Sequence, residues 1–303
     1  MPARRISLVN FKGGVGKTSI TVNLAASLAR ELDQKVLVVD MDAQSNTSIW
    51  LMGVARWNNL NGMPEKSVWG LFHPESTGLK QCIEEEVLLN EHGVERIPKL
   101  DLIPAVYKLM DLEHEYQDDD STPYFAKFRM QLEILFDQYD YILFDCPPNV
   151  FRATRCALFS SEEVYVPANP DLLSYVGLSL LSDKIAQFHS QTAFHRKAFP
   201  GFRPAEIRGI ILNAVETGAE YRKILDMMQA KIINLRPRQV VSSDADILPT
   251  TIRRTVSASK TQLDALPATL GSNTALREDY VNLARFIHNT PLEKKGHKYA
   301  KKH

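Results

Sequence analysis

The stretch 6-ISLVNFKGGVGKTSITVNLAASL-28 joins an apolar run, a glycine-rich loop and an amphipathic segment. Apolar residues recur every four positions from Ile20 to Leu32, a spacing that predicts one buried helix face. The order strand, loop, helix is typical of a phosphate-binding loop with the pattern G-x-x-x-x-G-K-[ST]. The end of that pattern is present at 16-GKT-18, but Phe11 stands where the first glycine is expected.

The residue types of this loop suit the binding of phosphate. Glycines let the backbone fold tightly and turn several N–H groups toward one point, where the following helix adds the positive end of its dipole. A lysine after the last glycine can reach the β- and γ-phosphates, and the next hydroxyl can ligate Mg²⁺. We therefore expect a nucleotide site made of Gly13, Gly14, Val15, Gly16, Lys17, Thr18 and Ser19.

The rest of the chain alternates short apolar runs with longer amphipathic segments. This alternation indicates the α/β class, with a mostly parallel, twisted sheet and helices on both faces. We expect strands near 5–11, 36–40, 101–105, 141–145, 163–168, 207–215 and 238–242, helices near 123–139, 171–188, 219–234 and 275–289, and loops with short helices over 55–100. The expected organisation is a single P-loop domain over residues 1–290, followed by a basic tail over 291–303.

Two of the expected strands end in aspartate. Asp40 ends the strand at 36–40, and Asp42 lies two residues on, so both can face the same side of an extended chain. Asp145 ends the strand at 141–145 and precedes Cys-Pro-Pro, whose prolines fix the departing chain. Nucleotide hydrolysis needs Mg²⁺ and a positioned water, and carboxylates at strand ends are the expected providers. The second aspartate motif has the Walker B arrangement, which places Asp145 near the metal.

The segment 12-KGGVGKTS-19 resembles the deviant Walker A loop of the ParA/MinD family of ATPases. In that family the first glycine is often replaced and an additional signature lysine is present. The resemblance implies that Lys12 reaches across a dimer interface to phosphate bound in the partner subunit. It also implies that ATP and Mg²⁺ are bound, that basal hydrolysis is weak, and that the site is completed only in the ATP-bound homodimer.

Other segments match the same family. The segment 40-DMDAQSN-46 resembles its D-x-D element followed by Gln and Asn, which implies that Asp42 orients or activates the attacking water and that Asp40 lies in the outer shell of the metal. The family often has Pro and Gly where this chain has Ala43 and Ser45. The stretches 102–116 and 163–181 also resemble family segments, so the likeness runs from about residue 5 to about residue 290.

Asn213 stands at the end of an expected strand. In the wider class of dimeric P-loop proteins an asparagine at the corresponding place often reads adenine. A plain turn residue at the end of the strand is an equally open interpretation.

The resemblance implies a dimer that binds a surface and is released by an activating partner. For ParA the surface is non-specific DNA and the partner is ParB-like, whereas for MinD the surface is membrane. The MinD-like tail is an amphipathic helix, but Pro291 and Gly296 interrupt 286-FIHNTPLEKKGHKYAKKH-303, so membrane binding is not expected. Contacts to DNA phosphates need basic residues on one exposed face; the candidates are Arg222, Lys223, Arg253 and Arg254.

Composition excludes several classes of protein. The formal net charge is zero, so overall charge points to no partner, and no apolar run approaches the roughly 20 residues that cross a membrane. The three cysteines form no C-x-x-C pair, which suggests a reducing, cytoplasmic setting with ordinary thiols, and their spacing does not match the paired cysteines of an iron–sulfur reductase. The resemblance to ParA implies that the protein is associated with the nucleoid. A metabolic ligase such as dethiobiotin synthetase is disfavoured by Lys12. A ParA relative that positions another cargo, such as a protein array or microcompartment, remains the main alternative.

Overall fold

The computed structural model describes residues 2–73, 78–87, 97–114, 122–215, 219–254 and 267–290, so the expected tail at 291–303 lies outside the described residues. One sheet holds seven strands in the order β3-β2-β4-β1-β5-β6-β7, and its neighbouring strands run parallel. The strands are β1 (Arg4–Leu8), β2 (Val36–Asp40), β3 (Leu100–Ile103), β4 (Tyr141–Asp145), β5 (Glu163–Ala168), β6 (Glu206–Leu212) and β7 (Val241–Ile247).

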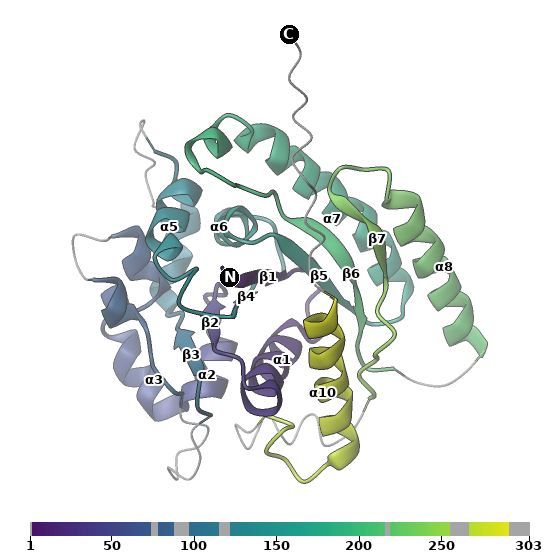
Figure 1. Cartoon of the computed structure of the whole chain (residues 1–303), viewed down its shortest axis with the longest axis horizontal. Helices are drawn as coiled ribbons and strands as arrows, with labels where there is room; N and C mark the ends of the chain where they lie inside the picture. Colours follow the sequence, from purple (N-terminus) through teal and green to yellow (C-terminus); the bar gives the residue numbers. More distant parts are fainter. Residues whose placement is uncertain are drawn as a thin grey trace.

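Helices cover both faces of this sheet (Figure 1). One face carries α1 (Lys17–Leu32), α2 (Asn46–Met52), α3 (Val54–Asn61) and α10 (Thr274–Asn289). The other carries α5 (Tyr124–Glu133), α6 (Arg152–Ser160), α7 (Leu172–Thr192) and α8 (Ala219–Leu235), and the short α4 (Asp111–His114) packs beside α6.

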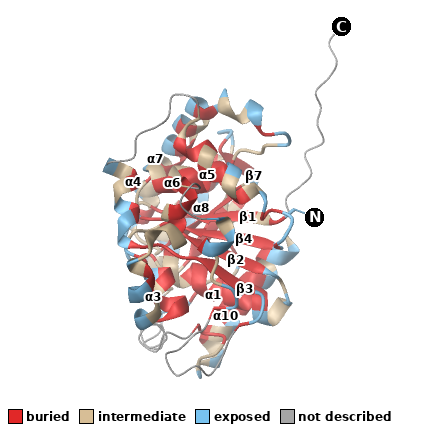
Figure 2. Cartoon of the chain, turned by 90° about the vertical axis from the view of Figure 1, so that its left-hand side faces the viewer, coloured by how far each residue is buried: buried red, intermediate tan, exposed pale blue. Residues whose placement is uncertain are grey.

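Alternating side chains of the strands supply both cores. In β2, Val36 and Val38 face the α1 side, and Leu37 and Val39 face the α6 side. All five residues of β2 are buried, as expected for a central parallel strand. Figure 2 shows the buried layer along the sheet, with exposed residues gathered on the outer surfaces of the helices. The α/β class with a parallel sheet and helices on both faces, expected from the sequence, is confirmed.

The sequence-based boundaries differ most from the structure at one helix and one strand. The helix expected over 123–139 ends at Glu133, because the carbonyl of Phe136 accepts a bond from Ala3 N at 2.6 Å and the chain continues in tight turns. The last strand, expected at 238–242, lies at 241–247. Its sequence VSSDADI is polar because this strand is at the edge of the sheet, with two consecutive exposed positions.

The segment between β2 and β3 is built from short helices, as expected. Besides α2 and α3 it contains single 3₁₀ turns at Pro64–Lys66, Val68–Phe72 and Leu79–Cys82. Within the described part of the chain, no helix combines the length and the apolar character needed to cross a bilayer.

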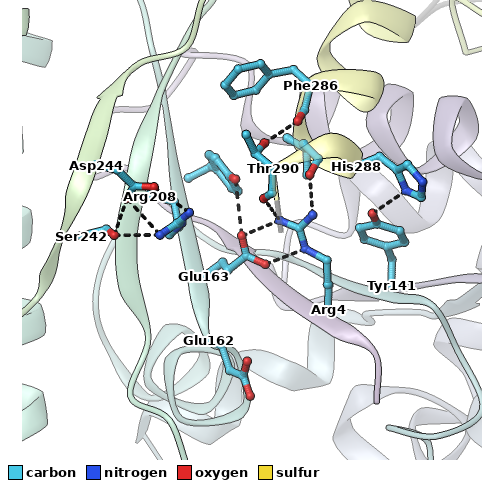
Figure 3. Close-up of polar contacts among 12 residues, drawn as sticks. Arg4, Tyr141, Glu162, Glu163, Arg208, Ser242, Asp244, Phe286, His288 and Thr290 are labelled. Atoms are coloured by element: carbon cyan, nitrogen blue, oxygen red, sulfur yellow. Dashed lines mark hydrogen bonds and ion pairs between the residues drawn. The ribbon is translucent and has the colours of Figure 1, made fainter. Parts of the chain in front are cut away.

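An ion pair between Arg4 of β1 and the buried Glu163 of β5 lies beside the end of α10 (Figure 3). The Arg4 guanidinium donates to both carboxylate oxygens of Glu163, at 2.9 and 2.7 Å. It also donates to the carbonyls of Ile287 and Thr290 at the end of α10. Since the amino ends of β1 and β5 carry this pair, Arg4 fixes α10 against the amino edge of the sheet and supplies the positive charge favoured at a helix C-terminus.

We expect Glu163→Gln to lower the free energy of unfolding by about 3–5 kcal/mol, because it leaves the buried Arg4 guanidinium without its anionic partner. The Glu163 side chain is 0% exposed. The matched control is Asp33→Asn, which breaks an ion pair with Lys99 between side chains that are 87% and 44% exposed and should cost at most about 1 kcal/mol. Urea unfolding of both variants measures the difference; equal losses would show that the pair contributes no more than a surface contact.

Candidate nucleotide-binding site

The glycine-rich loop connects β1 to α1 at the carboxyl edge of the sheet. Gly14 and Gly16 take left-handed backbone conformations, with φ of 73° and 86°, and Gly16 is the residue that precedes α1. Residues with a Cβ rarely adopt this conformation, so the turn depends on glycine here. Val15 between them is fully buried and anchors the loop.

Two side chains of the loop, Phe11 and Lys17, are held inside the protein. Phe11 replaces the first glycine, and its half-buried ring packs against the core on the α5–α8 face. Lys17 is almost fully buried, and its Nζ donates to the carbonyl of Lys12 at 3.3 Å across the loop. Burial lowers the pKa of Lys17, while the nearby charge of Asp145 opposes the change.

Asn213 holds the loop from the end of β6. Its Nδ2 donates to the carbonyl of Val15 at 3.0 Å. A Cβ placed on Gly16 would lie 2.1 Å from that nitrogen, so the approach of Asn213 leaves no room for a side chain. Asn213 also lines the cleft above the loop. This position is compatible with a contact between Asn213 and the adenine base.

Asp145 is buried at the end of β4 and connects three segments. Its Oδ2 accepts from the hydroxyls of Thr18 at 2.7 Å and Thr47 at 2.6 Å, and its Oδ1 accepts from Thr21 at 3.3 Å. Burial raises the pKa of Asp145 to about 6, although the bonds from Thr47 and Thr18 oppose the rise. The sequence identified Asp145 and Thr18, but Thr47 has no motif of its own and was missed.

Asp40 lies opposite Asp145 in the register of β2 and β4. Its Oδ2 accepts from the backbone N and the hydroxyl of Ser48, at 2.9 and 2.6 Å, and its Oδ1 accepts from Asp42 N at 3.1 Å. Burial, with the neighbouring Asp145 charge, raises the pKa of Asp40 well above its ordinary value. In this structure the carboxylate of Asp40 therefore fixes the start of α2 and the turn that carries Asp42.

Asp42 is partly exposed and lines the cleft. Its Oδ1 accepts from Gln44 N at 3.0 Å, which orders the turn leading into α2. Ser45, at the position where the resembling family often has glycine, takes a left-handed conformation with φ of 55°. The turn thus keeps a glycine-like backbone although its residue is serine.

These groups surround a cleft of about 480 Å³ at the carboxyl edge, where parallel α/β sheets bind ligands. It is lined by Gly13, Gly14, Gly16, Lys17, Thr18, Ser19, Asp42, Gln44, Asn46, Pro148 and Asn213. Among the described residues no cluster of three acidic, His or Cys side chains would hold a metal alone. Mg²⁺ at nucleotide sites is usually bound by one or two oxygen atoms of the protein, and phosphates and waters complete its coordination. The hydroxyl of Thr18 and the carboxylate of Asp145 are oxygen ligands of this kind, so these residues fit Mg²⁺.

The Lys12 side chain reaches the start of α7 and is not among the residues that line the cleft. Its Nζ forms an ion pair with Asp171, the residue that caps the N-terminus of α7 by accepting from Ser174 N at 2.8 Å. The backbone N of Lys12 donates to Asn10 Oδ1 at 3.0 Å. Sequence reasoning did not identify Asp171; an aspartate before a helical stretch is an ordinary capping signal and gives no hint of its partner.

The four basic residues considered for DNA lie near the ends of β6 and β7. Arg222 and Lys223 are exposed near the start of α8. Arg253 instead forms a two-bond pair with Asp279 of α10, with both distances at 2.7 Å. The bridge between Val215 and Arg253, and the bond from Arg254 N to Val215 O, place this segment beside the strand that ends at Asn213.

Comparison with known proteins finds a family described as "AAA domain" that matches residues 3–197. The chromosome partitioning protein ParA of Myxococcus xanthus is 31% identical over 188 residues, 60% of this chain and 58% of that protein. The sporulation initiation inhibitor protein Soj of Bacillus subtilis is 32% identical over 195 residues, 62% of this chain and 67% of that protein. The matches thus span about three fifths of this chain and of the first relative.

Solved structures share the fold over most of the chain. A plasmid partition protein from Borrelia burgdorferi, bound to AMPPNP, has a TM-score of 0.65 at 18% identity and covers 96% of this chain and 100% of its own. A cobyrinic acid a,c-diamide synthase from Mycobacterium smegmatis, with an ATP analogue and magnesium, has a TM-score of 0.66 at 18% identity, covering 95% and 94%. At these identities the likeness concerns the fold.

We expect Gly16→Ala to destabilise the protein by about 1–3 kcal/mol, because a Cβ is strained at this φ and displaces Asn213 from Val15. The matched comparison is Gly13→Ala, whose Cβ meets nothing within 4 Å. Thermal unfolding of both variants, without nucleotide, measures the effect. Adding Asn213→Ala to Gly16→Ala should recover the part due to the clash; strictly additive losses would mean that the two residues do not interact.

Proposed function

Because the chain belongs to the AAA domain family matched by residues 3–197, and the ParA/MinD resemblance seen in its sequence is confirmed, we propose that it is a Mg²⁺-dependent ATPase of ParA type. In this proposal ATP drives formation of a homodimer that binds DNA without sequence specificity. A ParB-like activator then stimulates hydrolysis and releases the dimer, and this cycle moves plasmid or chromosomal DNA.

One observation carries the ATPase assignment. The left-handed glycines, Lys17 and the Thr18–Asp145 pair converge on the same cleft at the carboxyl edge of the sheet. Backbone N–H groups and a helix N-terminus there suit the binding of phosphate. The partly exposed carboxylate of Asp42 lies in the same cleft, where a water molecule could be oriented toward a terminal phosphate.

The roles proposed for the residues follow from this arrangement. Lys17 and the loop N–H groups bind the phosphates, and Asp42 orients the attacking water. Thr18 and Asp145 would hold Mg²⁺, with Asp40 behind them organising the turn that carries Asp42. When bound, Mg²⁺ neutralises charge on the phosphate oxygens.

Dimer formation is proposed to involve Lys12. In the described chain its ammonium pairs with Asp171 of the same subunit. If Lys12 contacts phosphate in a partner subunit, the pair with Asp171 has to be exchanged for that contact. The proposed dimer therefore requires a rearrangement of Lys12, and the site of an isolated subunit lacks that cation.

The proposed DNA contacts rest on Arg222, Lys223 and Arg254. Arg253 lies beside them, but its guanidinium charge is neutralised by Asp279, so it contributes less to binding unless that pair opens. Association with the nucleoid would follow from such contacts. A ParA-like ATPase that carries another cargo would have the same ATPase site and would differ in the surface it binds.

We expect Asp42→Ala to bind ATP and dimerise but to hydrolyse ATP at least about 100-fold more slowly, since it loses the group that orients the water. Steady-state phosphate release, together with binding of a fluorescent ATP analogue, separates these two effects. Lys17→Ala is the comparison that should lose binding as well. Hydrolysis by Asp42→Ala at the wild-type rate would contradict the role proposed for this carboxylate.

Asp42→Ala protein should bind random duplex DNA with ATP but not with ADP, and the affinity should fall steeply with salt. Adding Arg222→Ala and Lys223→Ala should reduce the slope of log affinity against log salt by about 0.9 for each lost phosphate contact. Lys80→Ala, an exposed lysine in the 3₁₀ turn at 79–82, is the control and should change neither. Absence of DNA binding by a nucleotide-bound dimer would favour another surface or cargo.

A further inference from the structure

A short loop between β4 and α6 borders the nucleotide cleft. It follows Asp145, and Pro148 within it lines the cleft. The end at β4 is fixed by strand pairing, including the bond from Met41 N to Asp145 O at 2.9 Å. Because few residues separate Asp145 from Arg152, where α6 begins, the position of Pro148 depends on how the start of α6 is held.

The start of α6 is held by a residue from another segment. Phe151 occupies the capping position, and its side chain makes no capping bond and is 61% exposed. The carboxylate of Glu113 instead accepts from Arg152 N at 3.0 Å and from Ala153 N at 3.1 Å. A carboxylate bonded to free N–H groups at a helix N-terminus is a strong, charge-assisted contact.

The segment that carries Glu113 is packed into the core of the protein. It belongs to α4, where the neighbouring Leu112 is fully buried and Leu109 of the preceding 3₁₀ turn is 2% exposed. Both leucines belong to the core on the α5–α8 face. The Glu113 carboxylate thus ties the start of α6, and with it the loop, to this core, across a sequence separation of about 40 residues.

We propose that Glu113 is a positioning residue for the ATPase site: besides capping α6, it holds the loop in which Pro148 lines the cleft. The proposal rests on the proposed ATPase function. Displacement of reacting groups by about 1 Å can cost on the order of 100-fold in rate. Loss of the tether should therefore reduce turnover far more than stability would explain.

The test separates the tether from the cap. Glu113→Ala removes both, whereas Phe151→Ser in the same chain provides α6 with its own cap, because serine is preferred at that position and the φ of −92° suits it. The double variant Glu113→Ala/Phe151→Ser restores the cap but not the tether. Asp137→Ala, an exposed carboxylate after α5, is the control for loss of a negative charge.

For each full-length variant, kcat and KM for ATP, the melting temperature, and hydrogen exchange at residues 149–153 are measured. We expect the double variant to regain the melting temperature of Phe151→Ser, while its kcat stays about tenfold or more below that of Phe151→Ser. Recovery of kcat together with the melting temperature, or an unchanged kcat in Glu113→Ala, would overturn the proposal. If Glu113→Ala does not fold, the comparison of the double variant with Phe151→Ser, which does not need the single variant, decides.

Hydrogen exchange keeps this inference separate from the proposed function. If the wild-type protein does not hydrolyse ATP, the proposed ATPase activity fails, and exchange at residues 149–151 decides about the tether alone. Faster exchange there in the double variant than in Phe151→Ser supports the tether. Equal exchange in these two variants would sink it.

Discussion

The buried carboxylate of Asp145 organises the candidate site, because it joins segments that are about 100 to 130 residues apart in sequence. It accepts hydroxyl bonds from Thr18 of α1 and Thr47 of α2 while its backbone pairs within β4. A buried carboxylate that lacks hydrogen bonds destabilises the folded protein, because the loss of its hydration is not compensated. The three segments are therefore constrained to meet at one point, and the phosphate loop and the turn with Asp42 take their positions from it.

Near Asp145, two residues have a left-handed backbone conformation, and neighbouring side chains hold the chain there. Gly16 and Ser45 are both left-handed residues that precede a helix, α1 and α2 respectively. Side chains hold the backbone beside each of them: Asn213 donates to the carbonyl of Val15, and Asp40 accepts from the backbone N of Asp42. These contacts fix the backbone at the start of α1 and in the turn before α2, on two sides of the cleft.

Sequence patterns predicted the strand ends and the loop because these depend on local chemistry: apolar runs that end in Asp40 and Asp145, and glycines beside a lysine. They could not predict partners set by tertiary packing. For example, Ser48 donates to Asp40, and Asp279 accepts from Arg253, but neither Ser48 nor Asp279 belongs to a recognisable motif. The last strand was placed a few residues early because a polar edge strand lacks the apolar run on which the prediction depended.

The Arg4–Glu163 pair has a practical consequence for labelling. It places the first strand and the end of α10 together at the amino edge of the sheet (Figure 3). The cleft lies at the opposite, carboxyl edge. Labels attached at the exposed Pro2 or at Thr290 would lie on the side remote from the cleft. Both attachment points therefore leave the cleft accessible, and a donor and an acceptor placed on them start close together in one subunit.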